Sequence, residues 1–422
     1  NFVPPELEIL KRDMTLENPL CVLNVMKRHY DRYTPEMVAK VTGMDPDVMM
    51  KIWQVYAGTG KPGKAGALLY ALGQTQHTYG GQNCRAMSIV QLLLGNIGVP
   101  GGGLNAMRGE PNVQGATDVA CTVPDLPGYL KWPTAKKHRH LADYLHAETY
   151  ADGYYSNKPK FMVSFLKEFF GENATVENDY GYEMLPKIGP RLPASAWTTM
   201  GTFHMMRDGR IKGYFAWGMN PAHSTPNAKF ARNAMANLDW LVCADWFPTE
   251  TATFWKAPDM DPAKIQTEVY FLPAALIYEK IGSISNSGRW VQWRQQGVLP
   301  PGEAKSDFEI IEVLFDRIRS LYQKEGGVYP DPILKANMDY KIDGKYDLRA
   351  VCWAINGYTV QDGKLLPGYA QLQADGSTAC GMWIYSGYYN NEADKLDPMK
   401  QPTARRSKED PSGMGLFSGW SV

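Results

Sequence analysis

One short segment of the chain gathers the side chains best suited to hold a small anion. Residues 107–115 have the sequence Met-Arg-Gly-Glu-Pro-Asn-Val-Gln-Gly, which places Arg108 directly before Gly109. An arginine held at the mouth of such a loop binds a carboxylate through two parallel hydrogen bonds. Arg108 is therefore our candidate for recognising a carboxylate, although an arginine in a loop is also a common solvated surface cation.

Further polar residues follow three apolar runs of strand length. The pattern predicts strands over residues 65–72, 213–217 and 240–244, the first of them short and buried. Ligands of parallel α/β sheets bind beyond the carboxyl ends of the strands. The candidate residues that follow these strands are Gln76, Gly218, Asn220, Ser224, Asp245 and Thr251.

These strands alternate with helices. Helices are predicted over residues 19–30, from Pro35 behind the N-cap Thr34, from Pro46 behind the N-cap Asp45, and over 83–94, 160–170, 194–206 and 227–237. With a further strand over 268–272, the alternation predicts an α/β fold with a parallel, doubly wound sheet. The length suits two or three α/β-sized units, and we divide the chain into two domains, 1–115 and 116–422, the second ending in a long irregular part.

The charge balance argues against nucleic-acid or membrane binding. Of 422 residues, 44 are Lys or Arg and 44 are Asp or Glu, so the formal net charge is zero. A neutral chain has no general electrostatic attraction to nucleic acid or to an anionic membrane. The longest apolar stretch, 269–278, is about half as long as a membrane-spanning helix. We therefore expect no nucleic-acid partner and no direct insertion into a membrane.

Metal and nucleotide-hydrolysis motifs are incomplete. The six cysteines form no CxxC pair and the seven histidines lack helix-face spacing, so we predict no metal site built wholly from this chain. Residues 58–64 match a phosphate-binding P-loop, but Ala65 stands where a hydroxyl should ligate magnesium, and a helix precedes the loop instead of a strand. Residues 95–103 end a helix, whereas a dinucleotide fingerprint begins one. Nucleotide binding at 58–64 is the least favoured function.

Longer motifs extend over nearly the whole chain. They include Arg32-Tyr-Thr-Pro-Glu-Met-Val, Leu69-Tyr-Ala-Leu-Gly-Gln-Thr-Gln-His, Gln91-Leu-Leu-Leu-Gly-Asn-Ile-Gly, Gly103-Leu-Asn-Ala-Met-Arg-Gly-Glu-Pro-Asn-Val-Gln-Gly, Trp217-Gly-Met-Asn-Pro-Ala, Gly282-Ser-Ile-Ser-Asn-Ser-Gly-Arg-Trp-Val-Gln-Trp-Arg and Gln371-Leu-Gln-Ala-Asp-Gly-Ser-Thr. Together these motifs resemble the catalytic (alpha) subunit of molybdenum- or tungsten-dependent formate dehydrogenases.

The resemblance implies two doubly wound, Rossmann-like domains of the DMSO reductase and formate dehydrogenase type. Residues 1–115 would bind a pterin and carry the active-site arginine loop, and residues 116–422 would bind a guanine dinucleotide. The implied cofactor is bis(molybdopterin guanine dinucleotide) with molybdenum or tungsten. The part with a [4Fe–4S] cluster and a selenocysteine or cysteine metal ligand would lie upstream of Asn1, and a C-terminal cap would lie downstream of Val422.

Residue by residue, the resemblance makes Arg108 the active-site arginine that orients formate. It places Gln76 next to a pterin and Gly109 in contact with the cofactor. The residues it assigns to loops that face a guanine dinucleotide are Gly218, Asn220, Ser224, Asp245 and Thr251. Among these, Asp245 can accept hydrogen bonds from guanine, and the backbone N–H groups of residues 218–222 can receive a pyrophosphate.

The activity that the resemblance implies is the reversible two-electron oxidation of formate to CO₂. Electrons would pass to an iron–sulfur subunit and through it to a cytochrome b membrane subunit. The implied location is the periplasm, reached by export of the folded protein, and the fragment alone is expected to be inactive. Two alternatives stay open: another bis-pterin oxidoreductase, of the nitrate or arsenate reductase type, and a paralogue that binds the cofactor without catalysis.

Overall fold

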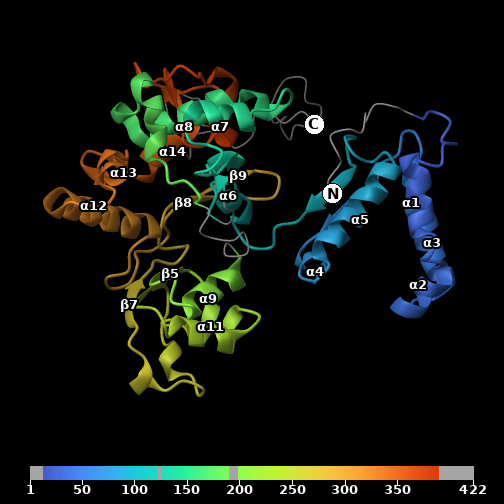
Figure 1. The fold of residues 1–422 in the computed structure, drawn as a ribbon, viewed down its shortest axis with the longest axis horizontal. Coiled ribbons are helices and arrows are strands. Elements are labelled where there is room, and N and C mark those ends of the chain that lie inside the picture. Colours follow the sequence, from blue (N-terminus) through green and yellow to red (C-terminus); the bar gives the residue numbers. More distant parts are fainter. Residues whose placement is uncertain (1–12, 122–124, 190–197, 389–422) are drawn as a thin grey trace. The chain divides into compact units, whose positions relative to one another are not determined.

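The computed structural model describes residues 13–121, 125–189 and 198–388. The chain forms two compact units that divide between Met107 and Arg108 (Figure 1). The boundary that we expected at residue 115 falls inside helix α6 (Val113–Asp118). This helix belongs to the second unit, because Asp118 is hydrogen-bonded to Arg289. Residues 194–197, the start of one predicted helix, lie outside the described ranges.

The first unit is built from helices around a small sheet. Thr34 and Asp45 are N-caps as predicted: the Thr34 hydroxyl accepts from the Met37 N–H at 3.2 Å, and the Asp45 carboxylate accepts from two N–H groups. The elements of this unit are α1 (Val22–Tyr30), α2 (Pro35–Thr42), α3 (Pro46–Ala57), β1 (Ala67–Tyr70), α4 (Leu72–Thr75), α5 (Gly80–Leu93) and β2 (Gly103–Ala106). Residues 58–64 connect α3 to β1, so the helix-before-strand order that argued against a P-loop is confirmed.

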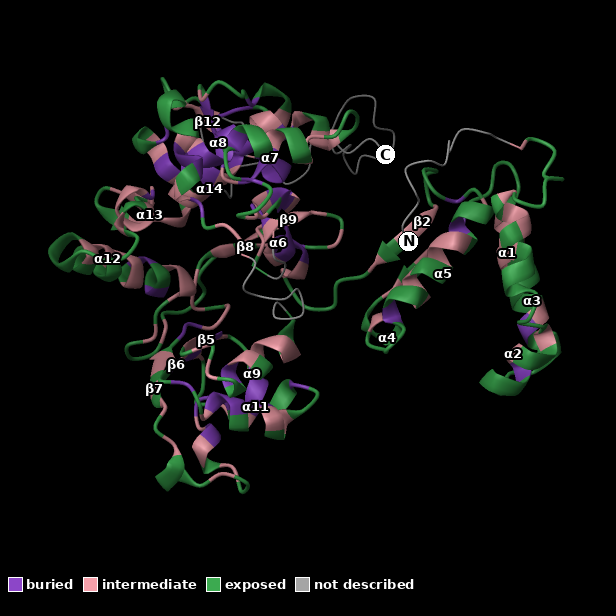
Figure 2. Ribbon diagram, viewed as in Figure 1, coloured by how far each residue is buried: buried purple, intermediate pink, exposed green. Residues whose placement is uncertain are grey.

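Strand β1 pairs in parallel with β2, but it is not the buried strand that we predicted. Leu69 is 66% exposed, because the described part of the unit covers this two-stranded sheet mainly with α5. Figure 2 shows that α1, α2 and α3 are likewise mostly exposed or half-buried. An apolar run of strand length therefore gives the strand correctly and its burial wrongly.

Two buried amides join the segments of the first unit. Gln91, fully buried on α5, donates to the backbone carbonyls of Gly66 and Gly103 and accepts from the Tyr56 hydroxyl at 2.7 Å. The neighbouring buried Asn96 accepts from the Gly66 N–H at 3.0 Å and donates to Gln91. Because every partner is itself buried or half-buried, these hydrogen bonds fix the loops against α5.

The second unit contains more elements. They are β3 (Asp125–Leu126), β4 (Leu130–Lys131), α7 (Leu141–Glu148), α8 (Lys158–Phe170), α9 (Thr199–Arg207), β5 (Gly213–Trp217), α10 (Pro221–Ser224), α11 (Ala228–Met235), β6 (Trp240–Asp245), β7 (Glu268–Pro273), β8 (Gly282–Ser285), β9 (Val291–Arg294), α12 (Asp307–Glu325), α13 (Pro330–Lys335), β10 (Lys341–Ile342), β11 (Lys345–Tyr346), α14 (Leu348–Asn356), β12 (Tyr358–Thr359) and β13 (Thr378–Ala379), in addition to α6. The predicted strands at 213, 240 and 268 are all confirmed.

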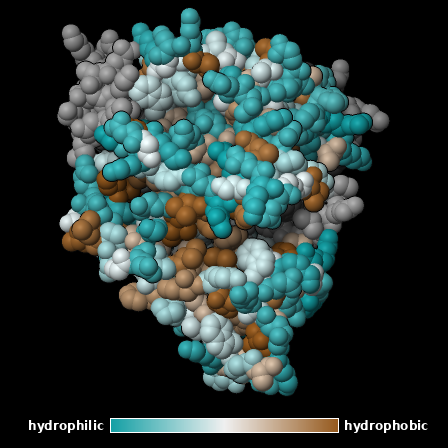
Figure 3. All heavy atoms as spheres, turned by 90° about the vertical axis from the view of Figure 1, so that its left-hand side faces the viewer, coloured by the Kyte–Doolittle hydropathy of each residue, from teal (hydrophilic) through white to brown (hydrophobic). Residues whose placement is uncertain are grey.

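Strands β5, β6 and β7 form a parallel sheet in that order. Leu241 and Cys243 of β6 are buried in a core shared with α9 and α11, which lie together on one side of the sheet (Figure 1). The opposite face leaves Phe215 and Tyr270 exposed. Hydrophobic residues also gather near the middle of the face seen in Figure 3. The predicted α/β order with parallel strands is confirmed.

A second core surrounds α8. Phe161 stacks on Trp383 with ring centroids 4.2 Å apart and an interplanar angle of 4°. The Trp383 indole N–H donates to the Gly128 carbonyl at 2.9 Å. This core also contains Tyr385, whose hydroxyl donates a hydrogen bond to Asp118 on α6. It therefore anchors the region around α6.

One buried acid on α12 makes stability depend on pH. Burial and the nearby Asp316 raise the pKa of Glu312 from its ordinary value to about 7. Between the two values the folded state binds more protons than the unfolded state, so the free energy of unfolding falls as pH rises from about 4.5 to about 7. We expect Glu312→Gln to stabilise the protein at pH 8 by up to about 3 kcal/mol and to have little effect at pH 4.5.

Denaturant unfolding at both pH values measures this difference. The exposed Glu303→Gln variant is the control, and its effect on the free energy of unfolding should be the same at both pH values. Equal effects of Glu312→Gln at the two pH values would contradict the assignment.

Candidate functional site

Arg108 is the first residue of the second unit. Its backbone N–H donates to the Ser287 hydroxyl at 2.9 Å, and its side-chain Nε donates to the Gln114 carbonyl oxygen at 3.4 Å. Among the described residues, its two terminal nitrogens have no hydrogen-bond or ion-pair partner, and the residue is exposed. The residue is thus held at its backbone and at Nε, and its two terminal nitrogens remain as donors for a carboxylate.

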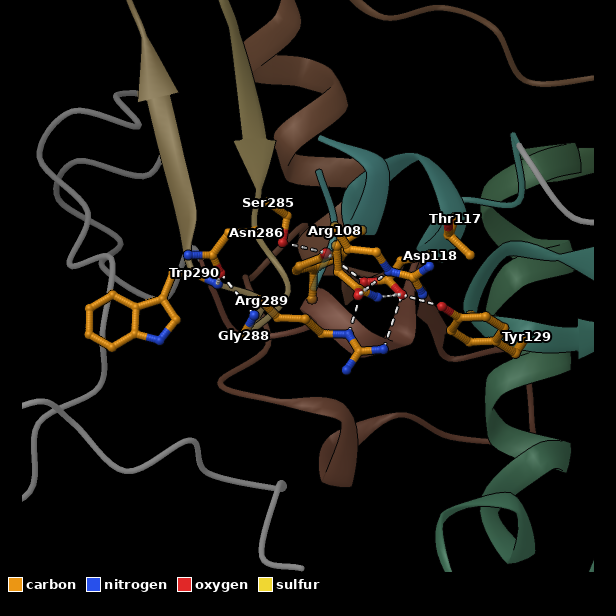
Figure 4. Close-up of polar contacts among 12 residues, drawn as sticks. Arg108, Thr117, Asp118, Tyr129, Ser285, Asn286, Gly288, Arg289 and Trp290 are labelled. Atoms are coloured by element: carbon orange, nitrogen blue, oxygen red, sulfur yellow. Dashed lines mark hydrogen bonds and ion pairs between the residues drawn. The ribbon is translucent and has the colours of Figure 1, made fainter. Parts of the chain in front are cut away.

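Behind Arg108 lies a fully buried carboxylate, Asp118. Arg289 approaches it as a bidentate partner, with nitrogen–oxygen distances of 2.9 and 3.1 Å. The hydroxyls of Tyr129 and Tyr385 each donate to it at 2.7 Å, and the Gln114 amide donates at 2.8 Å. Figure 4 shows Arg289 and Tyr129 reaching Asp118 from opposite sides.

The loop between β8 and β9 positions Arg289. The Asn286 side chain accepts from the N–H groups of Gly288 and Trp290 at 3.0 and 3.1 Å, which closes the loop tightly. Arg289 itself has a φ of 55°, a conformation that costs energy in a residue with a Cβ. Such a conformation persists only when surrounding contacts hold it, and the bidentate pair with Asp118 is one of them.

A glycine allows α6 to approach this hairpin. A Cβ on Gly115 would lie 2.2 Å from the side-chain oxygen of Asn112, which no side chain tolerates. That same Asn112 oxygen accepts from the Ser285 N–H at 3.0 Å and so ties the segment to β8. Steric crowding therefore explains why the residue after Gln114 in the motif is a glycine.

The groups around Asp118 keep their protons at neutral pH. Burial, and then the hydrogen bond to Asp118, raise the pKa of Tyr129 to about 12. Burial and the charge of Asp118 also raise the pKa of Tyr385. Burial alone would lower the pKa of Arg289, but its hydrogen bonds and attraction to Asp118 raise it. All three side chains are therefore hydrogen-bond donors to the carboxylate.

Two residues predicted to bind a ligand, Asn220 and Thr251, instead join the loops that follow β5 and β6. The Thr251 N–H and hydroxyl both donate to the Asn220 side-chain oxygen, at 3.0 and 2.8 Å. The Asn220 amide donates to Glu250 at 2.5 Å, a bond that lowers the pKa of Glu250. Thr251 is fully buried, so in this structure its side chain fixes the Asn220 loop and has no surface for a ligand.

Half of the backbone donors expected for a pyrophosphate are also occupied. The Gly218 N–H donates to the Ala244 carbonyl at 2.9 Å, and the Ala222 N–H donates to the Thr251 hydroxyl at 3.0 Å. Residue 221 is proline and has no N–H. Within the described part of the chain, only Met219 and Asn220 keep a backbone N–H without a partner in residues 218–222. In this structure these are the two N–H groups of the stretch that are left for a phosphate.

Other predicted residues keep free polar atoms. One carboxylate oxygen of Asp245 accepts from the Trp246 N–H at 2.7 Å, and the other has no partner in the described residues. Gln76 ends helix α4 with an exposed side chain, and Gly109 is exposed. The Ser224 hydroxyl is exposed and donates to the Asn220 carbonyl at 2.9 Å.

The contact between Thr251 and Asn220 can be tested by an isosteric change. Thr251→Val removes the hydroxyl and leaves the buried Ala222 N–H without an acceptor, so we expect the free energy of unfolding to fall by about 1–3 kcal/mol. Ser224→Ala, which removes an exposed hydroxyl from the same loop, should change it by less than about 0.5 kcal/mol. Denaturant titration measures both, and equal losses would refute the contribution of the buried hydroxyl.

Sequence reasoning missed the residues around Asp118. Gln114 and Arg289 occurred in motifs, but neither was assigned a role, and Tyr129 and Tyr385 gave no signal. In the described residues, no three His, Cys, Asp or Glu side chains meet in a way that could hold a metal ion. No helix there is both long enough and apolar enough to cross a membrane.

The chain is similar to known proteins over its whole length. The family model described as molybdopterin oxidoreductase matches residues 10–317. Formate dehydrogenase 2 subunit alpha (cytochrome c-553) of Nitratidesulfovibrio vulgaris is 44% identical over 97% of this chain and 41% of its own length. The nitrate-inducible formate dehydrogenase major subunit of Escherichia coli is 40% identical over 100% of this chain and 42% of its own. The formate dehydrogenase subunit alpha of Megalodesulfovibrio gigas is 42% identical, with coverages of 97% and 41%. The chain thus spans about two fifths of the length of these relatives.

Proposed function

Because the chain belongs to the molybdopterin oxidoreductase family, we propose that it is the central part of a formate dehydrogenase catalytic subunit. One observation carries this proposal: Arg108 is held at Nε and through its backbone, while its two terminal nitrogens have no partner among the described residues. A guanidinium in this state is suited to a planar carboxylate, and formate is the smallest one. The proposal is also supported by the formate dehydrogenase subunits that the chain resembles.

Arg108 has two tasks in the proposed reaction. It binds formate by an ion pair and so directs the C–H bond away from the guanidinium. When formate loses two electrons and a proton, the neutral product CO₂ no longer makes that ion pair and leaves. Bound molybdenum- or tungsten-pterin would supply the acceptor for the two electrons.

For the cofactor we propose bis(molybdopterin guanine dinucleotide). The free oxygen of Asp245 lies at the carboxyl end of β6, where it can accept from the guanine N1 and N2 hydrogens, and the free N–H groups of Met219 and Asn220 suit a phosphate oxygen. The residue that we propose for the pterin is Gln76, whose exposed amide follows β1. Asn220 and Thr251 act by holding this loop in place. Gly109, Gly218 and Ser224 remain proposed cofactor contacts.

The partners and the location are proposals of the same origin. We propose a [4Fe–4S] cluster elsewhere in the subunit, an iron–sulfur subunit as electron acceptor, a cytochrome b subunit beyond it, and the periplasm as location. They are supported by the formate dehydrogenase subunits to which the chain is 40–44% identical.

The test of the function uses the full-length protein. Purified anaerobically, it should reduce a viologen dye with formate and should release guanosine monophosphate when its cofactor is hydrolysed. Nitrate- or arsenate-dependent oxidation of the reduced dye, without formate activity, would replace the proposal with the other bis-pterin class. Retention of cofactor with none of these activities would indicate a binding paralogue.

A further inference from the structure

Asp118 lies behind Arg108, and the proposed function gives it no role. Its two oxygens receive five N–H or O–H groups, from Gln114, Tyr129, Tyr385 and, twice, Arg289. A carboxylate offers about four lone-pair sites, so this acceptor is saturated. An amide or a protonated acid at position 118 would place one of its own hydrogens against these donor groups. The site therefore requires a side chain at this position that only accepts hydrogen bonds.

Asp118 determines which way the Gln114 amide faces. An amide has one end that donates and one that accepts, and the two ends are nearly equal in shape. Because Asp118 only accepts, it binds the NH₂ end at 2.8 Å. The carbonyl end is then left facing Arg108, and it accepts from Nε at 3.4 Å. A reversed amide would set its NH₂ group against the Nε–H of Arg108.

This arrangement fixes the direction of the Arg108 guanidinium. The guanidinium is planar, so a bond at Nε sets the plane in which its two terminal nitrogens lie. The Ser287 hydroxyl holds the backbone of the same residue at 2.9 Å. Gln114 is buried and can transmit the position of Asp118 without competing water.

Arg289 gives the cluster its charge balance. Its bidentate pair with Asp118 joins one positive and one negative charge. The positive charge of Arg108 is then left over, which favours an anion at its free end. Without Arg289, the buried negative charge behind Arg108 would reduce that attraction.

We propose that Asp118 is a positioning residue for substrate binding: through Gln114 it directs the terminal nitrogens of Arg108 toward the formate carboxylate. The proposal rests on the proposed function, in which Arg108 binds formate. It predicts that Asp118 acts on formate affinity and that it acts through the amide of Gln114.

The test uses full-length holoenzyme with equal metal content in every variant. We expect Asp118→Asn and Gln114→Met each to raise KM for formate on the order of 10–100-fold, with smaller changes in kcat. Formate binding measured without an electron acceptor, as the formate concentration that raises the melting temperature, should weaken by the same factor. The double variant should be no weaker than Asp118→Asn alone, because both changes interrupt one path.

A matched control separates positioning from stability. Glu148 forms another ion pair of the second unit, with Lys158 at 3.7 Å, and both side chains are largely buried. Glu148→Gln should lower the melting temperature and leave KM for formate unchanged.

The outcomes distinguish the two proposals. A parent enzyme that oxidises no formate refutes the proposed function. A parent that oxidises formate, together with a Gln114→Met variant of unchanged KM, overturns the positioning role even where Asp118→Asn does not fold. Additive effects of Asp118→Asn and Gln114→Met would also overturn it, because Asp118 would then act without the amide.

Discussion

Replacement of Arg108 by alanine is expected to lower kcat/KM for formate about 10²–10⁴-fold in the full-length enzyme. The change removes the charged partner of a carboxylate, a loss of about 3–5 kcal/mol provided that the bound cofactor and the rest of the full-length enzyme shield the exposed guanidinium from water. It disturbs little else, since the side chain makes one hydrogen bond to the residues that the structure describes, at Nε. Steady-state formate oxidation with a dye acceptor measures the effect, after metal and pterin contents have been matched to the parent.

Two further variants test whether the fall in kcat/KM comes from loss of the guanidinium at position 108. Arg108→Lys keeps the positive charge but loses the planar fork, so it should recover part of the activity. Arg317→Ala removes an exposed arginine from α12 and should leave kcat/KM unchanged. Near-normal kinetics for Arg108→Ala with intact cofactor would remove Arg108 from the mechanism.

Replacement of Trp383 by alanine should have the largest effect on stability, about 3–5 kcal/mol. The indole is buried, stacks on Phe161 and donates to the Gly128 carbonyl, so its loss leaves both a cavity and an unpaired carbonyl. Neighbouring Tyr385 reaches Asp118, and the damage should therefore extend toward α6. Denaturant unfolding of the second unit, followed by near-ultraviolet circular dichroism, measures the change.

Two other substitutions separate the contributions of the aromatic ring and of the indole N–H to this loss of stability. Trp383→Phe keeps an aromatic ring opposite Phe161 but not the N–H donor, and it should cost less than the alanine change. Trp246→Ala removes a tryptophan that is half exposed and should cost much less. Equal losses at positions 383 and 246 would contradict the packing argument.

Local signals were sufficient for many elements of the fold. Thr34 and Asp45 cap their helices because the cap depends on residues two or three positions away, which a sequence displays directly. The strand beginning at Gly213 was found because apolar residues and turn residues mark its limits. Burial of β1 was misjudged, because what covers a strand depends on distant segments.

The candidate site was harder to predict for the same reason. Asp118 and Arg289 are 171 positions apart, and only the folded hairpin brings them together. Asn220 and Thr251 were correctly placed at strand ends, but their side chains bond to each other. A polar residue at a strand end satisfies either a ligand or a neighbouring loop, and residue type alone does not distinguish the two. Arg108 differs, because none of the acids in the described residues forms an ion pair with it.

The buried amide of Gln91 has a consequence for how the protein is made. Its partners span residues 56 to 103, so the interior of the first unit stays open until Gly103 has left the ribosome. Until then the amide can reach only its earlier partners, Tyr56 and Gly66, and strand β1 lacks its parallel neighbour β2. Domains emerging from the ribosome fold as units, and this one has to wait for its last strand. The nascent chain therefore exposes the unpaired edge of β1 until residues 103–106 have been synthesised.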